Sequence, residues 1–175
     1  INSDATLAGA FASPKQEVEG VFSAIRYLRR SLDLFANLRP AKSRPVSGSA
    51  QGVDMLMVRE NTEGLYVAQE RRYGDVAIAD AVITRPASSR ITRVALEQAE
   101  RRDKKLVIVH KANVLPITTG LFLETALETA RNYSAVSTSD LMVDAAATKL
   151  VLDPESFDVL VTTNLFGDIL SDLMA

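Results

Sequence analysis

The sequence predicts an α/β fold in which helices cover both faces of a mostly parallel β-sheet. Two observations support this prediction. Short apolar runs with β-branched residues recur at residues 55–58, 106–109 and 159–161, and such runs are typical of strands buried on both faces. A polar turn follows each run, and most of these turns lead into a segment with apolar residues at helical spacing. Repeated strand, turn and helix units are the pattern of a parallel sheet.

The first part of the chain predicts one strand, one helix and one extended basic segment. Residues 6–12 form a short apolar run that ends at a Ser-Pro pair, which favours a buried strand followed by a turn. Residues 21–34 predict an amphipathic helix, because apolar side chains recur every three or four positions. Two prolines keep residues 38–45 extended. The small polar residues 47–52 are a candidate domain boundary.

The middle of the chain contains a predicted β-hairpin. Residues 65–71 and 76–84 have strand-like composition and are joined around Gly74 and Asp75, a pair typical of tight turns. A two-stranded hairpin is only marginally stable by itself. We therefore expect this arm, at about residues 65–85, to pair with another chain.

The rest of the chain alternates between helix and strand. The predicted elements are a helix at 89–102, a strand at 106–109, a helix at 120–131, a strand at 141–143, a helix at 144–150 and a strand at 159–161. This last strand leads through an Asn/Gly turn at residues 164–167 into a final helix.

The composition excludes several classes of protein. The chain has 175 residues, of which 47% are hydrophobic, and a net charge of -2, so we expect one good core, the edge of a second, and no general nucleic-acid or membrane-surface role. Six of the 20 basic residues nevertheless lie between Arg26 and Arg44, which suggests a local anion site. The absence of cysteine excludes disulfides and fits a reducing compartment, and we expect a cytoplasmic protein.

Two acidic residues on the final helix suggest a cation site. Asp168 and Asp172 are four residues apart, so they share one helix face, where like charges are destabilising unless a positive group lies between them. A divalent cation is one such group. The alternative is structural, because one Asp can complement the helix dipole and the other can simply be exposed.

Polar residues cluster where the predicted strands end. If these carboxyl ends share one edge, they bring together Arg59, Tyr66, Lys111, Asp144, Asp168 and Asp172. Such a set can bind a divalent cation through oxygen, hold an anionic substrate, and donate and accept protons. For Lys111 the alternative is an ordinary surface lysine. His110, the single histidine, is interpreted as a neighbour of the catalytic residue and not as a catalytic residue itself.

Several of these motifs resemble the β-decarboxylating dehydrogenases, which include isocitrate, isopropylmalate and homoisocitrate dehydrogenases. The motifs are Leu-Arg-Pro at residues 38–40, RENTEGLY at 59–66, HKAN at 110–113 and NLFGDILSD at 164–172. Their order matches the family, and the likeness spans nearly the whole chain. The resemblance implies oxidation of a 2-hydroxy acid with a carboxylate on the next carbon, using NAD or NADP and Mg²⁺ or Mn²⁺.

The resemblance also implies a domain organisation. Residues 1–36 would be an incomplete part of a first, cofactor-side domain, and residues 37–175 would be a second, dimer-forming domain that carries the hairpin arm. The chain begins at Ile1 and ends at Ala175 within a helical pattern. We therefore expect a fragment of a longer protein, inactive alone, whose active site is shared in a homodimer or a dimer of dimers.

Matching the motifs implies a role for each residue. Arg29, Arg39 and Arg59 would bind substrate carboxylates, for which the guanidinium fork is suited. Asp168 and Asp172 would bind the metal from one subunit. Lys111 and Asp144 would enter the same site from the partner, and Lys111 would also contact the substrate and accept its hydroxyl proton. Tyr66 would contact the substrate and donate a proton. Asn113 would lie near the nicotinamide.

The identity of the substrate depends on two further residues. Glu63 resembles the isocitrate and homoisocitrate branch, because isopropylmalate enzymes usually lack it. Arg26 lies three residues before Arg29 and so shares its face, which suits a longer acid with a distant carboxylate. Residues 24–30 resemble homoisocitrate dehydrogenases of lysine synthesis through aminoadipate, which make 2-oxoadipate and usually use NAD. The alternatives are that Arg26 is only solvated and that the substrate is isocitrate or 3-isopropylmalate.

Two rival classes of function differ from this interpretation. A phosphohydrolase with an aspartate nucleophile needs Asp-x-Asp after a strand, and the sequence contains no such motif. A non-catalytic dimerisation module would use the hairpin and helices only for association.

Overall fold

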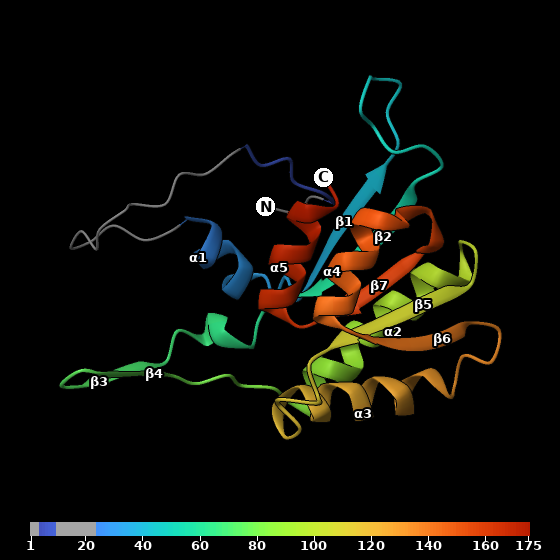
Figure 1. The fold of residues 1–175 in the computed structure, drawn as a ribbon. Helices are drawn as coiled ribbons and strands as arrows, with labels where there is room; N and C mark the ends of the chain where they lie inside the picture. The colour runs from blue at the N-terminus through green and yellow to red at the C-terminus, as the bar shows by residue number, and fades with distance from the viewer. Residues whose placement is uncertain (1–3, 10–23) are drawn as a thin grey trace. The chain divides into compact units, whose positions relative to one another are not determined.

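The computed structural model of the protein describes residues 4–9 and 24–175 and is drawn in Figure 1. Contacts divide the chain into one compact unit of residues 1–34 and another of residues 35–175. Helix α1 (Ala24–Ser31) belongs to the first unit, and all the other described helices and strands belong to the second.

This division bears on the predicted boundary. The loop at residues 47–52 lies inside the second unit, so it is wrong as a boundary between compact units. The cofactor-side role of residues 1–36 and the dimer-forming role of residues 37–175 stay predictions.

A five-stranded sheet forms the centre of the second unit. Its strands are β1 (Ala36–Lys42), β2 (Asp54–Glu60), β5 (Lys105–His110), β6 (Ser137–Met142) and β7 (Val159–Thr162). Their spatial order is β1-β2-β7-β5-β6; β1 is antiparallel to β2, and the other neighbouring pairs are parallel. The three inner strands carry apolar residues on both faces, because both faces are covered.

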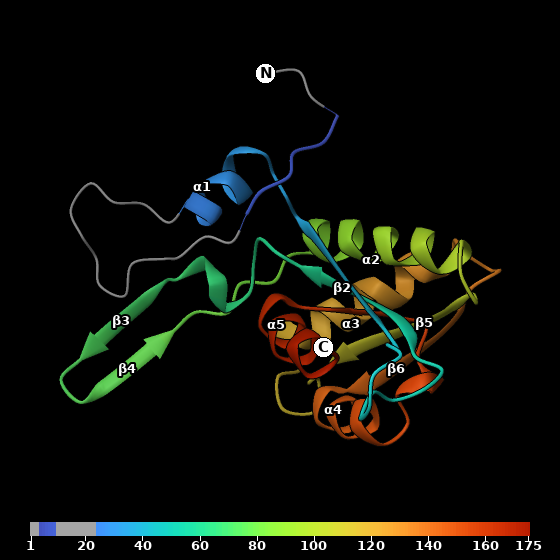
Figure 2. The same cartoon turned by 90° about the horizontal axis from the view of Figure 1, so that it is seen from above.

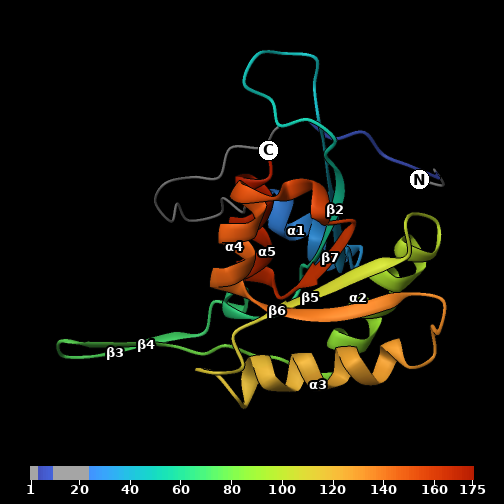
Figure 3. The ribbon, with the colours of Figure 1, turned by 45° about the vertical axis from the view of Figure 1, so that its right-hand side comes forward.

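Helices pack on both faces of this sheet, as Figure 3 shows. They are α2 (Arg85–Glu100), α3 (Thr118–Ala130), α4 (Val143–Leu152) and α5 (Asn164–Leu173). One core joins Ile91 of α2 and Phe122 of α3 to the sheet, and a second core joins Leu150 of α4 and Leu170 of α5 to its other face. The predicted α/β fold is confirmed. Among the described residues, no helix is both long enough and apolar enough to cross a membrane.

The predicted hairpin is confirmed and extends away from the sheet in Figures 1 and 2. It consists of β3 (Glu70–Tyr73) and β4 (Val76–Ala79), which pair antiparallel around Gly74. Gly74 has a φ of 59°, a left-handed conformation that glycine adopts without steric cost. The first arm begins later than predicted, because residues Leu65–Val67 form a short 3₁₀ helix. Pairing of the arm with another chain stays a prediction.

Two predictions near the amino terminus have different outcomes. Residues 6–9 of the predicted strand 6–12 form no strand, and residues 10–12 lie outside the described residues. The helix predicted at 21–34 is present as α1, while residues 21–23 also lie outside the described residues.

Several element boundaries differ from prediction, and three of them have local reasons. The extended basic segment is the strand β1, where Pro40 is tolerated because β1 is an edge strand. The edge strand β6 begins at Ser137, four residues earlier than predicted, because its exposed polar residues hide the pattern of a buried strand. Residues 164–167 form the first turn of α5, with extended Thr163 before it, so the predicted Asn/Gly turn is wrong.

Candidate active site at the carboxyl edge of the sheet

The carboxyl ends of four parallel strands lie along one edge of the sheet. β2, β7, β5 and β6 are neighbours and run in the same direction. The polar segments that follow them are therefore presented along this edge, where open α/β sheets bind ligands. Within the described residues, these segments form two groups of side chains.

The first group is centred on Arg59, near the end of β2. Arg59 is only 1% exposed, and a buried guanidinium needs hydrogen-bond partners to offset the loss of water. Its Nε and Nη2 atoms donate to Asn164 Oδ1 over 3.0 and 2.7 Å, and Nη1 donates to Asp168. The guanidinium carbon also lies 5.0 Å from the centre of the Tyr66 ring. Arg59 thus connects β2, α5 and the base of the hairpin arm.

Arg39 from β1 lies between the two aspartates of α5. Its Nη1 atom is 2.8 Å from Asp172 Oδ1, and its Nη2 atom is 3.6 Å from Asp168 Oδ1. The same Nη1 donates to Ser171 Oγ over 3.0 Å. The positive group expected between Asp168 and Asp172 is therefore an arginine in this structure, and its guanidinium contacts both carboxylates.

The environment of Asp168 favours its charged form. Partial burial opposes ionisation, but the Tyr66 hydroxyl and the Arg59 and Arg39 guanidiniums together hold the pKa of Asp168 below its ordinary value. Conversely, burial and the adjacent Asp168 carboxylate raise the pKa of Tyr66, whose hydroxyl donates to Asp168 Oδ2. Tyr66 therefore stays protonated near neutral pH. We call Arg39, Arg59, Tyr66, Asp168 and Asp172 the arginine–aspartate cluster.

We expect Asp168→Asn to lower the stability of the protein in a pH-dependent way. Because the pKa of Asp168 is depressed on folding, its stabilisation is complete above the ordinary pKa of 3.8 and is lost as pH falls through the folded value. Urea unfolding should show wild type more stable than the variant by about 1 kcal/mol at pH 7, a value that allows for solvent screening. The difference should shrink below about pH 4. A constant difference across this range would contradict the prediction.

The second group is the ion pair between Lys111 and Asp144. Lys111 directly follows β5, Asp144 lies in the first turn of α4, and Lys111 Nζ is 2.6 Å from Asp144 Oδ1. The hydrogen bond from Lys111, helped by a backbone hydrogen bond, holds the pKa of Asp144 below its ordinary value. Asn113 is exposed in the turn that follows Lys111.

His110 supports the turn that carries Lys111. His110 is buried, and its Nδ1 atom accepts a hydrogen bond from the backbone N–H of Ala112 over 3.0 Å. Its Nε2 atom therefore carries the proton and donates to Asp140 Oδ2 over 3.1 Å. The interpretation of His110 as a neighbour of a catalytic residue stays a prediction.

The donor atoms in these two groups fit a hard divalent cation. Carboxylate oxygens are the ligands that Mg²⁺ and Mn²⁺ prefer, and Asp168 and Asp172 already converge on one positive group. The part of the chain that the structure describes contains no group of three His, Cys, Asp or Glu side chains able to hold a metal. A complete set of three aspartates within one chain is thus not found there.

Two residues important to the cluster were not predicted as site residues. Asn164 holds Arg59, and Gly167 allows α5 to approach it, because a Cβ at position 167 would lie 2.6 Å from Arg59 Cγ. The sequence signal that could have found them is that both belong to the NLFGDILSD motif at residues 164–172, which also contains Asp168. The predicted substrate residues Arg26 and Arg29 belong to the first unit, and the side chain of Arg26 lies outside the described residues.

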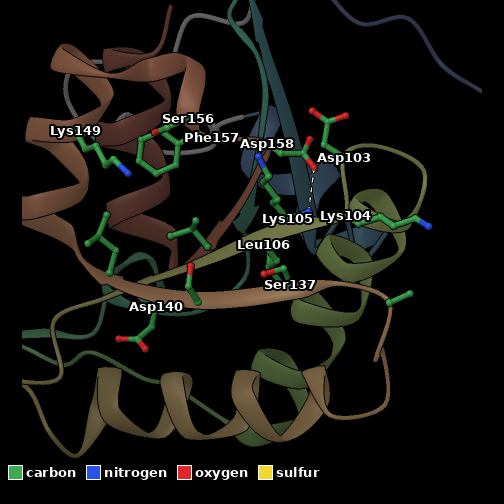
Figure 4. A pocket seen from close by; sticks show the side chains of 14 residues that line it. Asp103, Lys104, Lys105, Leu106, Ser137, Asp140, Lys149, Ser156, Phe157 and Asp158 are labelled. Carbon is green, nitrogen blue, oxygen red and sulfur yellow. Dashed lines mark hydrogen bonds between the residues drawn. The ribbon is translucent and has the colours of Figure 1, made fainter.

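A cavity of about 520 Å³ lies at the other end of the strands. Figure 4 shows Lys105, Ser137, Phe157 and Asp158 around it, with the Lys105 backbone N–H donating to Asp158. Lys105 and Ser137 are the first residues of their strands, and Leu141 near the end of β6 also lines the cavity, so it extends from the amino edge along β6. Its lining includes Asp140, the partner of His110, but no residue of the arginine–aspartate cluster and neither Lys111 nor Asp144.

Comparison with known proteins identifies the family of the chain. A family model described as isocitrate/isopropylmalate dehydrogenase matches residues 1–175. The chain belongs to the isocitrate/isopropylmalate dehydrogenase family. It is 64% identical over its whole length to the isocitrate/homoisocitrate dehydrogenase of Thermus thermophilus, of which it covers 53%.

The chain also matches relatives that carry other enzyme names. The chain is 45% identical to the homoisocitrate dehydrogenase of Methanocaldococcus jannaschii, an alignment that covers 97% of the chain and 52% of that relative. It is 48% identical to the 3-isopropylmalate dehydrogenase of Archaeoglobus fulgidus, over 99% of the chain and 52% of that relative. A crystal structure of isocitrate dehydrogenase from Methylococcus capsulatus is 46% identical, with a TM-score of 0.81 over 92% of this chain and 50% of that one. The chain therefore spans about half the length of these relatives.

Proposed function

We propose that this protein catalyses the NAD-dependent oxidative decarboxylation of homoisocitrate to 2-oxoadipate, a step of lysine synthesis through aminoadipate. The observation that carries the proposal is the arginine–aspartate cluster, which combines two guanidiniums, two carboxylates and a phenol at the carboxyl edge of the sheet. Further support comes from family membership and from the 64% identity to an isocitrate/homoisocitrate dehydrogenase.

Substrate carboxylates bind to arginines in this proposal. Arg39 and Arg59 come from adjacent strands and both pair with Asp168, so their positive charge is concentrated at one place. Arg26 and Arg29, on α1, bind the remaining carboxylates. A tricarboxylic hydroxy acid provides the negative charge that such a set of guanidiniums requires.

Asp168 and Asp172 of one subunit, together with Asp144 of the partner subunit, would hold Mg²⁺ or Mn²⁺. A bound divalent cation supplies Lewis acidity, which makes the substrate hydroxyl easier to ionise and stabilises negative charge on its oxygen. The support for a second subunit is that the described acidic residues include no complete three-carboxylate set. The proposed assembly is therefore a homodimer, or a dimer of dimers, with shared active sites.

Two side chains carry out the proton transfers in this proposal. Lys111 of the partner subunit accepts the proton of the substrate hydroxyl, directly or through water. Tyr66 donates a proton to the carbon that loses CO₂, a role supported by the environment that keeps its phenol protonated. Asn113 lies beside the nicotinamide, and NAD supplies the acceptor for the hydride that leaves the hydroxyl-bearing carbon.

Isocitrate and 3-isopropylmalate are the alternative substrates, because relatives with both kinds of name match the chain. A non-catalytic dimerisation module is the alternative of a different class. Its support is the exposed hairpin arm, since every residue of β3 and β4 is exposed in the structure.

Titration of the full-length protein with Mn²⁺ separates these possibilities. We expect NADH formation that requires the metal and is most efficient with homoisocitrate, compared with isocitrate and 3-isopropylmalate as kcat/KM. A preference for either of the other acids reassigns the substrate. Absence of metal-dependent NADH formation with all three acids contradicts the dehydrogenase proposal and favours the module.

Arg26→Val tests the basis of the substrate choice. We expect about a 100-fold loss of kcat/KM with homoisocitrate, because a charged hydrogen bond to the distant carboxylate is removed, and a much smaller loss with 3-isopropylmalate. Arg30→Val is a matched control on the same helix. Equal losses with both acids would refute the role of Arg26.

A further inference from the structure

Asn164 is a buried polar residue to which the proposed mechanism gives no role. It is the first residue of α5 and is 1% exposed. We propose that Asn164 is a positioning residue, which fixes the orientation of the Arg59 guanidinium and connects it to the base of the hairpin arm. The orientation of Arg59 follows from contacts within one chain, whereas its contact with substrate rests on the proposed function.

The amide oxygen of Asn164 binds one edge of the Arg59 guanidinium. Oδ1 accepts from Nε over 3.0 Å and from Nη2 over 2.7 Å. Two hydrogen bonds to one oxygen prevent rotation of the planar group about its Cδ–Nε bond. Nη1 is then directed to Asp168. Without Asn164, a buried guanidinium would lose the partner of two N–H groups and would have to turn to find others.

The amide nitrogen of Asn164 determines which way the side chain faces. Nδ2 donates to the backbone carbonyl of Glu63 over 3.1 Å. An amide has its donor and acceptor on opposite branches, so this bond leaves Oδ1 to face Arg59. An aspartate would place an acceptor against the Glu63 carbonyl oxygen, and an alanine would lose both contacts. The position therefore needs a side chain that accepts on one branch and donates on the other.

Glu63 extends this connection to both ends of the hairpin arm. Its carboxylate accepts from the Thr84 backbone N–H over 2.9 Å and from Thr84 Oγ1 over 2.7 Å. Gly64, which follows it, pairs with Val82 through two backbone hydrogen bonds. The chain thus enters and leaves the arm at one point, which Asn164 joins to Arg59.

The first test measures orientation without measuring activity. In full-length protein with ¹⁵N-labelled arginine, the Nε–H signal of Arg59, assigned by its loss in Arg59→Lys, should exchange slowly with solvent. Asn164→Ala should shift this signal and accelerate its exchange at least tenfold. An unchanged Nε–H signal would overturn the proposal, and this result is independent of whether the substrate assignment is correct.

The second test is a double-mutant cycle on kcat/KM with the best of the three acids. Asn164→Ala should lower kcat/KM about 10- to 100-fold, mainly through KM, because it misplaces a group that binds substrate. In an Arg59→Lys background the same substitution should change kcat/KM less than twofold, since Lys cannot form the two-point contact. Equal losses in both backgrounds would show that Asn164 does not act through Arg59.

Thr162→Val is the matched control for loss of stability. Thr162 is fully buried, lies opposite Arg59 in the sheet, and donates its hydroxyl to the Val109 carbonyl over 2.8 Å. The variant removes a buried hydrogen bond of the same neighbourhood without releasing Arg59. It should leave the Arg59 signal and KM unchanged even if its Tm falls. A KM increase equal to that of Asn164→Ala would attribute both effects to general destabilisation.

Discussion

Mixed dimers of Lys111→Ala and Asp168→Ala chains should regain activity that neither variant has alone. Under the proposed mechanism each variant should lose about 10³-fold in kcat, because both sites of its homodimer lack either the proposed base Lys111 or the proposed metal ligand Asp168. If each site takes Lys111 and Asp144 from one chain and Asp168 and Asp172 from the other, the heterodimer has one intact site and one doubly defective site. Random mixing should therefore restore about a quarter of wild-type activity.

The control for this experiment mixes two variants with defects in the same group. Lys111 and Asp144 form one ion pair within a chain, so every site of a Lys111→Ala and Asp144→Ala heterodimer carries a defect. These mixtures should remain inactive. Recovery in both mixtures would exclude the shared arrangement, and recovery in neither, with heterodimers confirmed by mass spectrometry, would show that each chain builds its site alone.

Gly167→Ala should damage both stability and activity, although alanine is ordinarily the better helix former. A Cβ at this position would lie 2.6, 2.7 and 3.2 Å from Cγ, Cβ and Cδ of Arg59. These atoms belong to the buried stem of the side chain, so relief requires movement of α5 or displacement of the guanidinium. We expect a loss of about 1–3 kcal/mol in unfolding free energy from overpacking. Displacement of Arg59 should also lower kcat/KM about 100-fold.

Gly120→Ala provides the comparison within another helix of the same unit. A Cβ there would meet its nearest atoms at 3.9 and 4.0 Å, which is ordinary van der Waals contact. This variant should be neutral or more stable by up to about 1 kcal/mol, as helix propensity predicts. Denaturant unfolding and steady-state kinetics of both variants check the prediction. Equal behaviour of the two variants would show that Arg59 does not restrict position 167.

The sequence by itself determined the fold class and the edge of the sheet that carries the candidate site. The inner strands at residues 54–60, 105–110 and 159–162 are local apolar runs, and burial on both faces leaves that signal in the sequence. The polar residues that follow each strand could be assigned to one edge because parallel strands end on the same side. The edge strands β1 and β6 were less predictable, because their exposed polar residues weaken the pattern.

The tertiary structure alone decided which side chains become partners. Arg59 and Asn164 are 105 residues apart, and Arg39 and Asp172 are 133 apart, so no local periodicity could reveal their contacts. Only the pairing of β1 with β2 and of β2 with β7 brings these residues together. Likewise, position 167 needs a glycine because α5 lies close to the side-chain stem of Arg59 there. Sequence patterns record burial residue by residue, whereas hydrogen-bond partners depend on strand order and register.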